Sequence, residues 1–311
     1  MQERSAFLIS NPNAGRGGRA RADEVGRFVA RLGELGVEVE RADTSGPRDA
    51  ERLAREAVGR GFREVVVSGG DGTINEALQG LVGAGVRVGI WPAGTANVLA
   101  RQLSLPFDAA QAAEVFARGA TRRITLGRAV EEETGRGRYF FLMAGIGLDA
   151  SVIRNVRPRL KKRVGEAAYW YSGLGHLAYW KPQPFTVEAG GEEYTATYAA
   201  VGKAPWYGGG LKLTPRARLD GEEFEVCLIN TRSRLRYLYL LSHAVRGGAP
   251  EGTRGVRYLR TPRLRARGDA YVQADGELIG RLPMTFEVVS DGVEIVVPEK
   301  IVTSDEQRQL L

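Results

Sequence analysis

The first third of the chain alternates between two hydrophobic periods. Short runs rich in valine, isoleucine and leucine, typical of buried strands, are each followed by a segment whose apolar residues recur every three or four positions, as in a helix with one buried face. Strands that alternate with helices favour a mostly parallel, doubly wound sheet. The expected strands are residues 6–10, 37–40, 64–67 and 86–90, and the expected helices are residues 20–33, 47–58, 73–81 and 96–103.

The pattern changes near residue 121, where short runs of alternating apolar and polar residues take over. Turn signals such as Asp291-Gly292 separate many of these runs. The pattern favours an antiparallel β-rich domain with a sandwich or barrel-like fold, interrupted by helices near residues 161–180 and 232–246. The expected strands are residues 138–142, 185–188, 194–201, 223–229, 256–259, 263–266, 271–274, 286–289 and 293–297.

We therefore predict two domains and a tail, which suits a chain of 311 residues. The predicted α/β domain covers residues 1–122 and the β-rich domain covers residues 123–298. Residues 299–311 form a C-terminal tail that we expect to pack back on the first domain.

Composition and charge limit the classes of molecule that the protein is expected to bind. The 44 basic and 37 acidic residues give a net charge of +7, which is modest for a nucleic-acid-binding protein but suits one that handles phosphates or contacts anionic lipid. The single cysteine, Cys227, excludes an internal disulfide and lies in an apolar run that predicts burial. No run approaches the ~20 apolar residues that span a bilayer. We expect a soluble, cytoplasmic protein whose membrane contact is peripheral and which has no nucleic-acid partner. The sequence does not determine the oligomeric state, and a homodimer is one of the alternatives.

One turn suggests chemistry. The strand of residues 64–67 ends at Ser68-Gly69-Gly70, and Asp71 then opens a helical segment. The glycines allow the backbone to turn sharply and approach a ligand, and the helix start offers N–H groups to an anion. Because a carboxylate there would repel a bare phosphate, Asp71 indicates a bridging cation or a proton-transfer role. The alternative is that Asp71 is a plain helix cap.

Two further glycine-rich loops, residues 11–18 and 92–97, also follow strands. In open α/β sheets ligands bind beyond the carboxyl ends of the strands, so the three loops are expected to converge at one edge. The loop of residues 11–18 lacks the Gly-Lys-Ser/Thr ending of a P-loop, and the Gly-x-Gly-x-x-Gly dinucleotide fingerprint is missing. A common hydride-transfer enzyme is therefore disfavoured.

Together the motifs resemble those of the diacylglycerol-kinase-catalytic-domain family, which includes bacterial soluble diacylglycerol kinases and is similar to sphingosine and ceramide kinases. The glycine-aspartate-glycine-threonine motif is shared with NAD kinases and phosphofructokinases, whereas the later motifs discriminate. The motifs, in order, are Asn11-Pro12-x-x-Gly15, Gly69-Gly70-Asp71-Gly72-Thr73-x-Asn75-Glu76, Pro92-x-Gly94-Thr95-x-Asn97 and Asp275-Gly276-Glu277.

The resemblance implies an NAD kinase-like first domain, a lipid-substrate second domain and ATP-dependent phosphorylation of a lipid hydroxyl, with diacylglycerol as the first acceptor. It places Asp275 and Glu277 beside the phosphates, where they supply the base and a Mg²⁺-linked carboxylate. The residues it assigns to ATP are Asn11, Pro12, Asn13, Ala14, Gly15, Thr44, Ser68, Gly69, Gly70, Asp71, Gly72, Thr73, Asn75, Glu76, Gly94, Thr95 and Asn97.

The resemblance also implies Mg²⁺. Asp71 and Glu277 are its expected carboxylates at the nucleotide. A second, peripheral Mg²⁺ is expected at Asp220, with backbone oxygens from Ala217 and Glu222. The alternative interpretation is an ordinary Asp-Gly turn at this position.

Two positions depart from the family pattern, and they motivate the second of two alternative functions. Val98 and Thr125 stand where many relatives have aspartate, the second in a metal-linked network. The alternatives are a small-molecule kinase of the NAD kinase class and a non-catalytic lipid-binding or regulatory relative.

A basic run at residues 154–163 contains no acid and is followed by aromatic residues that include Tyr179 and Trp180. A cationic stretch beside aromatic side chains suits an anionic bilayer surface, and a solvated helix start with core aromatics is the alternative.

Overall fold

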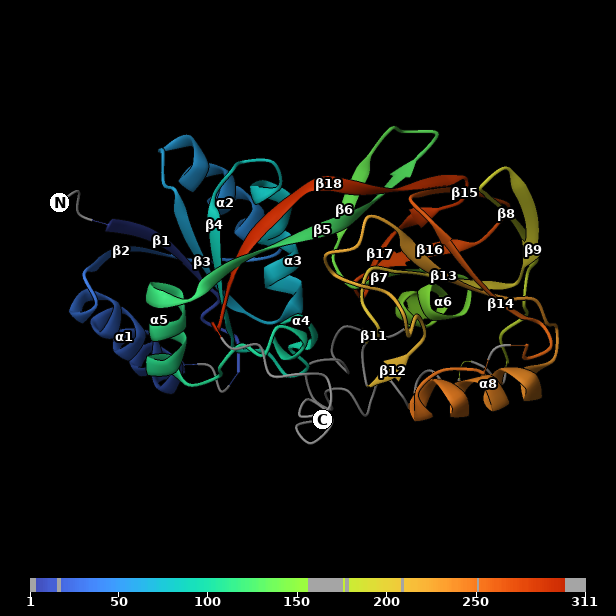
Figure 1. Ribbon diagram of the computed structural model, residues 1–311, viewed down its shortest axis with the longest axis horizontal. Coiled ribbons are helices and arrows are strands. Elements are labelled where there is room, and N and C mark those ends of the chain that lie inside the picture. Colours follow the sequence, from blue (N-terminus) through green and yellow to red (C-terminus); the bar gives the residue numbers. More distant parts are fainter. Residues whose placement is uncertain are drawn as a thin grey trace. The chain divides into compact units, whose positions relative to one another are not determined.

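The computed structural model describes residues 4–15, 18–155, 176, 179–207, 210–250 and 252–299 (Figure 1). The chain divides into two compact units. Unit 1 holds the described residues up to Ile124 and from Asp291 onward, and unit 2 holds those from Thr125 to Ser290. Apart from Glu299, the predicted C-terminal tail lies outside the described residues, and so does nearly all of the predicted helix at 161–180.

Unit 1 is a parallel sheet covered by helices on both faces, as the alternating pattern predicts. The sheet order is β2-β1-β3-β4-β18, and every neighbouring pair in it is parallel. Its strands are β1 (Arg4–Ser10), β2 (Val37–Asp43), β3 (Glu64–Gly69), β4 (Arg87–Pro92) and the last part of β18 (Met284–Val297). Its helices are α1 (Gly18–Glu34), α2 (Asp49–Gly59), α3 (Asp71–Leu81), α4 (Val98–Gln102) and α5 (Ala109–Arg118).

The core of unit 1 follows from the helical period. Val25, Phe28 and Leu32 recur on one face of α1 and are fully buried. The Phe28 ring stacks on Trp91 of β4 with ring centroids 4.6 Å apart. The sequence pattern did not predict α5, whose buried alanines and Phe116 share this core.

Unit 2 is an antiparallel β-sandwich. One sheet has six strands in the order β14-β13-β10-β7-β16-β17, and β15 pairs with β18 and β8 outside that sheet. One apolar cluster fills the space between the sheets and includes Val201 and Phe224 from the first and Val187 and Phe286 from the second. The predicted antiparallel β-rich fold is therefore confirmed.

The elements of unit 2 are numerous and short. Strand β5 (Ala120–Glu131) begins in unit 1 and continues into unit 2. The others are β6 (Gly137–Phe140), β7 (Met143–Ile146), α6 (Leu148–Asn155), β8 (Phe185–Ala189), β9 (Glu192–Ala196), β10 (Tyr198–Gly202), β11 (Trp206–Tyr207), β12 (Leu211–Lys212), β13 (Phe224–Ile229), α8 (Arg234–Arg246), β14 (Val256–Thr261), β15 (Arg263–Arg267), β16 (Tyr271–Ala274) and β17 (Glu277–Arg281).

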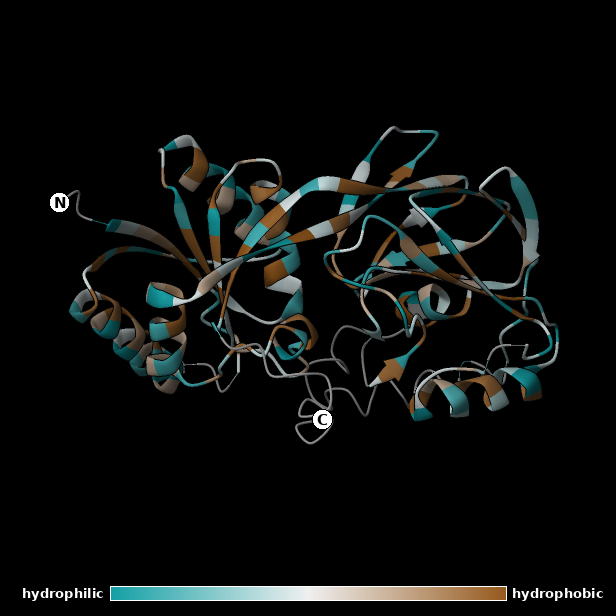
Figure 2. Cartoon of the chain, in the orientation of Figure 1, coloured by the Kyte–Doolittle hydropathy of each residue, from teal (hydrophilic) through white to brown (hydrophobic). Residues whose placement is uncertain are grey.

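Three local predictions in this half are wrong. Residues 194–201 do not form one strand, because β9 ends at Ala196 and β10, which belongs to the other sheet, begins at Tyr198. Residues 138–142 do not form one strand, because β6 ends at Phe140 and β7, which belongs to the six-stranded sheet, begins at Met143. Asp291-Gly292 is not a turn between two strands, because β18 runs through it without interruption. Helix α8, in contrast, begins and ends close to the predicted 232–246, and Figure 2 shows both hydrophobic and hydrophilic residues along it.

No helix of the described ranges is long and apolar enough to cross a membrane. Cys227 is buried in β13, as predicted, and burial raises the pKa of its thiol to about 12.

Candidate functional site

The three glycine-rich loops of unit 1 converge at the carboxyl edge of its sheet, as predicted. The backbone N–H of Asn11, which follows β1, donates to the carbonyl of Ser68 in β3 at 2.8 Å. The Asn11 side chain donates to Thr73 Oγ1 at 3.0 Å and accepts from the N–H of Asn13 at 2.9 Å. Thr44, which follows β2, donates its N–H to the carbonyl of Ser10 at the same edge.

Close backbone contact explains the glycines in two of these loops. A Cβ built on Gly94 would lie 2.5 Å from the Cα of Gly70 and 2.9 Å from Asn97 Oδ1. A Cβ on Gly15 would lie 3.0 Å from the carbonyl oxygen of Ala93, and Gly15 also has a φ of +63°. The loops therefore touch through their backbones, which leaves N–H groups close to any ligand at this edge.

Asn97 holds the third loop in shape. Its Oδ1 accepts from the N–H of Gly94 at 2.9 Å, and its Nδ2 donates to the Gly94 carbonyl at 2.7 Å. The residue is 2% exposed and has a φ of 48°, a conformation that asparagine tolerates. Asn97 thus shapes the loop, whereas the side chain of Thr95 is exposed.

Asp71 caps a helix other than its own. It is the first residue of α3, and its carboxylate oxygens accept from the N–H groups of Val98 and Leu99 at 3.1 and 3.3 Å. Those groups begin α4, so the side chain joins the second glycine loop to the third. This contact was not visible in the sequence, which suggested a metal ligand or a cap of the following helix.

Other predicted nucleotide residues lie in different settings. Asn75 is 3% exposed and points into unit 1 on α3, where its Oδ1 accepts from Gln79 at 3.1 Å. Glu76 is half-buried, and Gly72 is exposed at the start of the same helix. Pro12 is half-buried and Ala14 is buried in the loop after β1.

A buried cation lies behind the loops and was missed in the sequence. Arg21 of α1 is 2% exposed, donates to Ser68 Oγ, and stacks over Trp91 with 4.4 Å to the ring centroid. Burial lowers the pKa of its guanidinium. Arg21 precedes Val25 by four positions and so lies on the apolar face of the helix, which was the available signal.

Two buried polar atoms at this edge have no partner. Among the described residues, Ser10 Oγ and Arg21 Nε are the buried side-chain atoms without a hydrogen bond. Ser10 ends β1 and Arg21 contacts Ser68 near the end of β3. Unsatisfied buried donors are costly, so a phosphate-bearing ligand at this edge fits the residues that are present.

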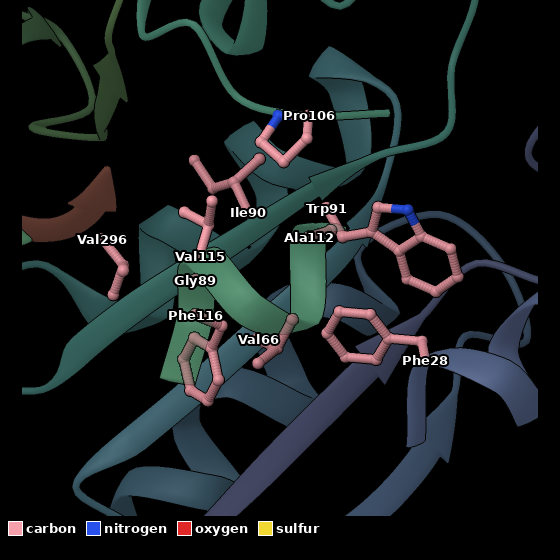
Figure 3. Close-up of a pocket in the computed structure, with 10 residues that line it drawn as sticks. All are labelled: Phe28, Val66, Gly89, Ile90, Trp91, Pro106, Ala112, Val115, Phe116 and Val296. Atoms are coloured by element: carbon pink, nitrogen blue, oxygen red, sulfur yellow. The ribbon is translucent and has the colours of Figure 1, made fainter. Parts of the chain in front are cut away.

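An apolar cavity in unit 1 does not belong to this edge. Figure 3 shows its lining, which includes Phe28, Trp91 and Phe116 and contains no charged side chain. Its volume of about 10 Å³ is close to that of a single water. It is a packing defect in the core rather than a ligand site.

In unit 2 the predicted catalytic pair lies on the β16–β17 hairpin. Asp275 and Gly276 have φ of 46° and 84°, which is the backbone of a tight type I′ connection. The Asp275 carboxylate accepts from the N–H groups of Phe141, Leu142 and Met143 at 2.8, 3.0 and 3.0 Å. Asp275 therefore fastens the hairpin to the segment between β6 and β7.

Glu277 has a different setting. Its Oε2 accepts from Arg138 Nη2 at 2.6 Å, and its side chain is 42% exposed. A carboxylate with one partly exposed partner retains accessible lone pairs, so Glu277 is better placed than Asp275 to receive a proton or contact a metal ion.

Sequence reasoning gave no role to the neighbouring Asp149 and missed Gln273. Gln273 is fully buried and donates to Asp149 Oδ2 at 2.8 Å, while its Oε1 accepts from the N–H of Gly276 at 2.9 Å. Burial raises the pKa of Asp149 to about 6. Gln273 thus connects a carboxyl group that titrates near neutrality to the acidic hairpin.

In the predicted peripheral metal loop, residues 217–222, the Asp220 side chain and the Gly221 carbonyl already have partners. Asp220 pairs with its neighbour Arg218, with Nε to Oδ1 at 3.0 Å. Lys203 donates from Nζ to the Gly221 carbonyl, and burial lowers the pKa of this lysine to about 8. Across the described ranges no cluster of three or more histidine, cysteine or carboxylate side chains could hold a metal ion. A divalent ion in this loop would have to share it with the ammonium of Lys203.

The fold and the edge define a class: an α/β protein with converging glycine-rich loops that is joined to a β-sandwich. Comparison with known proteins identifies the family. Residues 5–129 match the diacylglycerol kinase catalytic domain, and residues 143–297 match the YegS C-terminal NAD kinase beta sandwich-like domain. The chain belongs to the diacylglycerol kinase catalytic domain family, and it is a kinase.

Relatives match over nearly the whole chain. The chain is 31% identical to a diacylglycerol kinase from Mycobacterium tuberculosis, over 93% of this chain and 94% of the relative. It is 28% identical to a diacylglycerol kinase from Bacillus subtilis, over 95% and 97%. The fold is similar to a crystal structure of a diacylglycerol kinase from Bacillus anthracis, with a TM-score of 0.72, 17% identity and coverage of 96% and 98%.

Proposed function

We propose that this protein transfers the γ-phosphoryl group of ATP to the hydroxyl of a lipid, with diacylglycerol as the first acceptor to test. The convergence of three glycine-rich loops beside two unpartnered buried polar atoms is the observation that carries the nucleotide half of this proposal. The names of the relatives, diacylglycerol kinase in M. tuberculosis and B. subtilis, support the acceptor half.

The proposed reaction has one displacement. The lipid hydroxyl oxygen forms a bond to the γ-phosphorus, the bond from that phosphorus to the β–γ bridging oxygen breaks, and ADP leaves. The hydroxyl proton passes to a carboxylate, for which Glu277 is the candidate because its lone pairs are accessible. Asp275 supports this group by fixing the hairpin that carries it.

Mg²⁺ belongs to the proposal as the ion that accompanies ATP and offsets phosphate charge. Glu277 is its most accessible carboxylate among those predicted, because both oxygens of Asp71 are bonded to the start of α4. In unit 1 the chain's own contribution is to orient the phosphates with backbone N–H groups and to place Arg21 behind Ser68.

The test is phosphotransfer from labelled ATP to a total lipid extract, with the product identified by mass. The wild type is expected to form a lipid phosphomonoester, and Glu277→Gln is expected to lower turnover by about 10²–10⁴, the range of general-base catalysis. Glu193→Gln, an exposed carboxylate elsewhere in unit 2, is the matched control. Phosphorylation of NAD with no lipid product would favour the NAD kinase class, and ATP binding without any transfer would favour a non-catalytic relative.

A further inference from the structure

Large exposed hydrophobic side chains gather on one helix of unit 2. Leu235, Leu238, Tyr239 and Val245 of α8 are 77%, 42%, 48% and 54% exposed. Leu235, then Leu238 and Tyr239, then Ser242, then Val245 follow one another at intervals of three or four residues, which places them along one side of the helix. The opposite side, with Tyr237, Leu240 and Ala244, is buried, so the exposed stripe is not needed for the core.

A fifth exposed hydrophobic side chain lies beside α8. Tyr179 is 84% exposed, and the next residue, Trp180, packs edge-on against Tyr237 with ring centroids 5.1 Å apart. Arg234 Nε donates to the Trp180 carbonyl at 3.2 Å. Of the seven large hydrophobic side chains exposed among the described residues, five therefore lie on or beside α8, which is a patch rather than scatter.

The charge around the patch has one sign. Residues 230–250 contain Arg232, Arg234, Arg236 and Arg246 and no aspartate or glutamate. Arg234 and Arg236 donate to backbone carbonyls, and Arg246 donates to the Ser242 hydroxyl. Among the residues that the structure describes, none of the four arginines forms an ion pair. Arg236 stacks over the Tyr239 ring at 4.9 Å, which holds a cation beside an exposed aromatic face.

We propose that this surface docks on an anionic phospholipid bilayer. The α8 face is defined as Tyr179, Leu235, Leu238, Tyr239 and Val245 with the four arginines. Apolar side chains that enter the acyl boundary, surrounded by arginines at headgroup level, match the chemistry of such a surface. The biological purpose of this contact, access to a lipid acceptor, rests on the proposed function, whereas the contact itself does not require phosphotransfer.

The test is cosedimentation of the full chain with phosphatidylcholine vesicles that contain or lack phosphatidylserine. We expect binding only to the anionic vesicles, and Leu235→Ser with Leu238→Ser should lower the partition coefficient by about tenfold or more. Arg232→Glu with Arg246→Glu should remove the preference for phosphatidylserine. Phe107→Ser, 46% exposed in unit 1, and Arg27→Glu, exposed on α1, are the matched controls.

Two readouts separate this proposal from the proposed function. Turnover of a short-chain diacylglycerol dissolved below its micelle concentration reports phosphotransfer without a bilayer, and the α8 variants should retain it. If the wild type turned over that acceptor but did not bind the anionic vesicles, the docking proposal would be overturned and the proposed function would stand. Light scattering tests a different occupant: if the leucine variants convert a dimer to a monomer, a second copy covers the face and the bilayer proposal is wrong.

A separate observation concerns the loop that the resemblance assigned to a peripheral metal ion. Lys203 of unit 2 is 0% exposed, and its Nζ donates to the carbonyl of Gly221. The Thr125 hydroxyl donates to the Gly221 carbonyl at 2.5 Å and is 3.2 Å from the Leu219 carbonyl. Asp220, between them, pairs with Arg218.

We infer that the ammonium of Lys203 is the resident cation of this loop, and that the loop binds no divalent ion. Carbonyl oxygens turned inward need a donor or a cation, and here an ammonium and a hydroxyl supply it. The expected donors, Asp220 and the carbonyls of Ala217 and Glu222, belong to the same short loop, so a divalent ion on them would lie near the buried ammonium of Lys203 and be repelled by it. The threonine at position 125 fits this arrangement because a hydroxyl can donate to a carbonyl and a carboxylate cannot.

The test needs neither nucleotide nor lipid, so its outcome is independent of the proposed function. The wild-type melting temperature should be equal in EDTA and in Mg²⁺. Titration with Mn²⁺, followed by the paramagnetic signal of the ion, should give the same binding for the wild type and for Asp220→Asn. Lys203→Met should lower the melting temperature, whereas the exposed Lys181→Met should not. If Lys203→Met does not fold, the wild-type measurements still decide. A saturable Mn²⁺ site lost in Asp220→Asn would overturn the inference.

Discussion

Removal of the Asp275 carboxylate should destabilise unit 2 as a folded structure. Asp275→Ala deletes the acceptor of three N–H groups, those of Phe141, Leu142 and Met143, in residues that are at most 3% exposed. A buried donor left without a partner costs about 1–3 kcal/mol. Three such donors, partly relieved by entering water, give a loss of roughly 3–6 kcal/mol, and an alanine at φ of 46° adds about 1 kcal/mol.

The size of this effect can be judged against the whole domain. Domains of this kind unfold with a free energy of about 5–15 kcal/mol, so the loss is a large fraction of the total. Glu277→Gln provides the contrast, because it removes one pair with Arg138 that is partly exposed to solvent. Such pairs contribute about 0–1 kcal/mol, so this variant should unfold at nearly the wild-type urea concentration.

The assay is urea unfolding of both variants followed by near-ultraviolet circular dichroism, with turnover measured on the same samples. Asp275→Ala should show a lower midpoint, and Glu277→Gln a wild-type midpoint with greatly reduced turnover. A wild-type midpoint for Asp275→Ala would refute the anchoring role. If that stable variant were also inactive, Asp275 rather than Glu277 would be the group in contact with the reacting atoms.

Three further outcomes are expected. Gly94→Ala should weaken ATP binding by about tenfold or more, because its Cβ would lie 2.5 Å from the Cα of Gly70. An ATP affinity equal to that of the wild type in calorimetry would contradict this packing. Gly72→Ala, whose Cβ meets no atom within 4 Å, should not change the melting temperature. The pKa of Asp149 is raised from 3.8 to about 6, so the folded state keeps a proton that the unfolded state has lost. The free energy of unfolding should therefore fall by up to about 3 kcal/mol as the pH rises through this window. In urea titrations from about pH 4 to about pH 7, the free energy of unfolding of Asp149→Asn should not show this fall. If wild type and variant instead showed the same dependence on pH, the raised pKa of Asp149 would be contradicted. The pKa of the Cys227 thiol is raised to about 12 by burial, so the native protein should resist thiol-specific labelling until it is unfolded, and rapid labelling under native conditions would show that β13 opens.

The sequence predicts well what depends on local period. The parallel sheet of unit 1, the antiparallel strands of unit 2 and the convergence of the glycine loops all follow from hydrophobic spacing and from the rule that parallel strands end at one edge. The glycine at position 94 was recognised as part of a ligand loop, although its contact with Gly70 depends on two strands being neighbours.

The sequence predicts poorly what depends on distant pairing. The carboxylate of Asp71 is bonded to N–H groups 27 and 28 positions away, and that of Asp275 to groups more than 130 positions away. Nothing in the local spacing marks those partners. Asp291-Gly292 was interpreted as a turn for the same reason, because the local signal for a turn was strong and the strands that pair with β18 lie elsewhere in the chain.

Polar residues on apolar faces were the most informative signal that went unused. Arg21 occupies a position where the helical pattern calls for an apolar residue, and it is buried and bonded near a predicted site. Gln273, also buried, gave no such signal, because it alternates along β16 with Val272 and Ala274, which belong to the core. A buried polar side chain must be paired, so such positions point to nearby structure that spacing alone does not reveal.

Strand β18 also sets the order in which the protein can fold during synthesis. Its last residues, including Ile295, complete the parallel sheet beside β4, whereas everything from Thr125 to Ser290 forms the other unit. The ribosome therefore makes roughly 200 residues, over about 10–40 s, between β4 and the strand that covers its edge. During that interval β4 presents unpaired N–H and C=O groups on which another nascent chain could pair. Unit 2 can finish first, and a chain that stops before Asp291 is expected to aggregate through the open edge of β4.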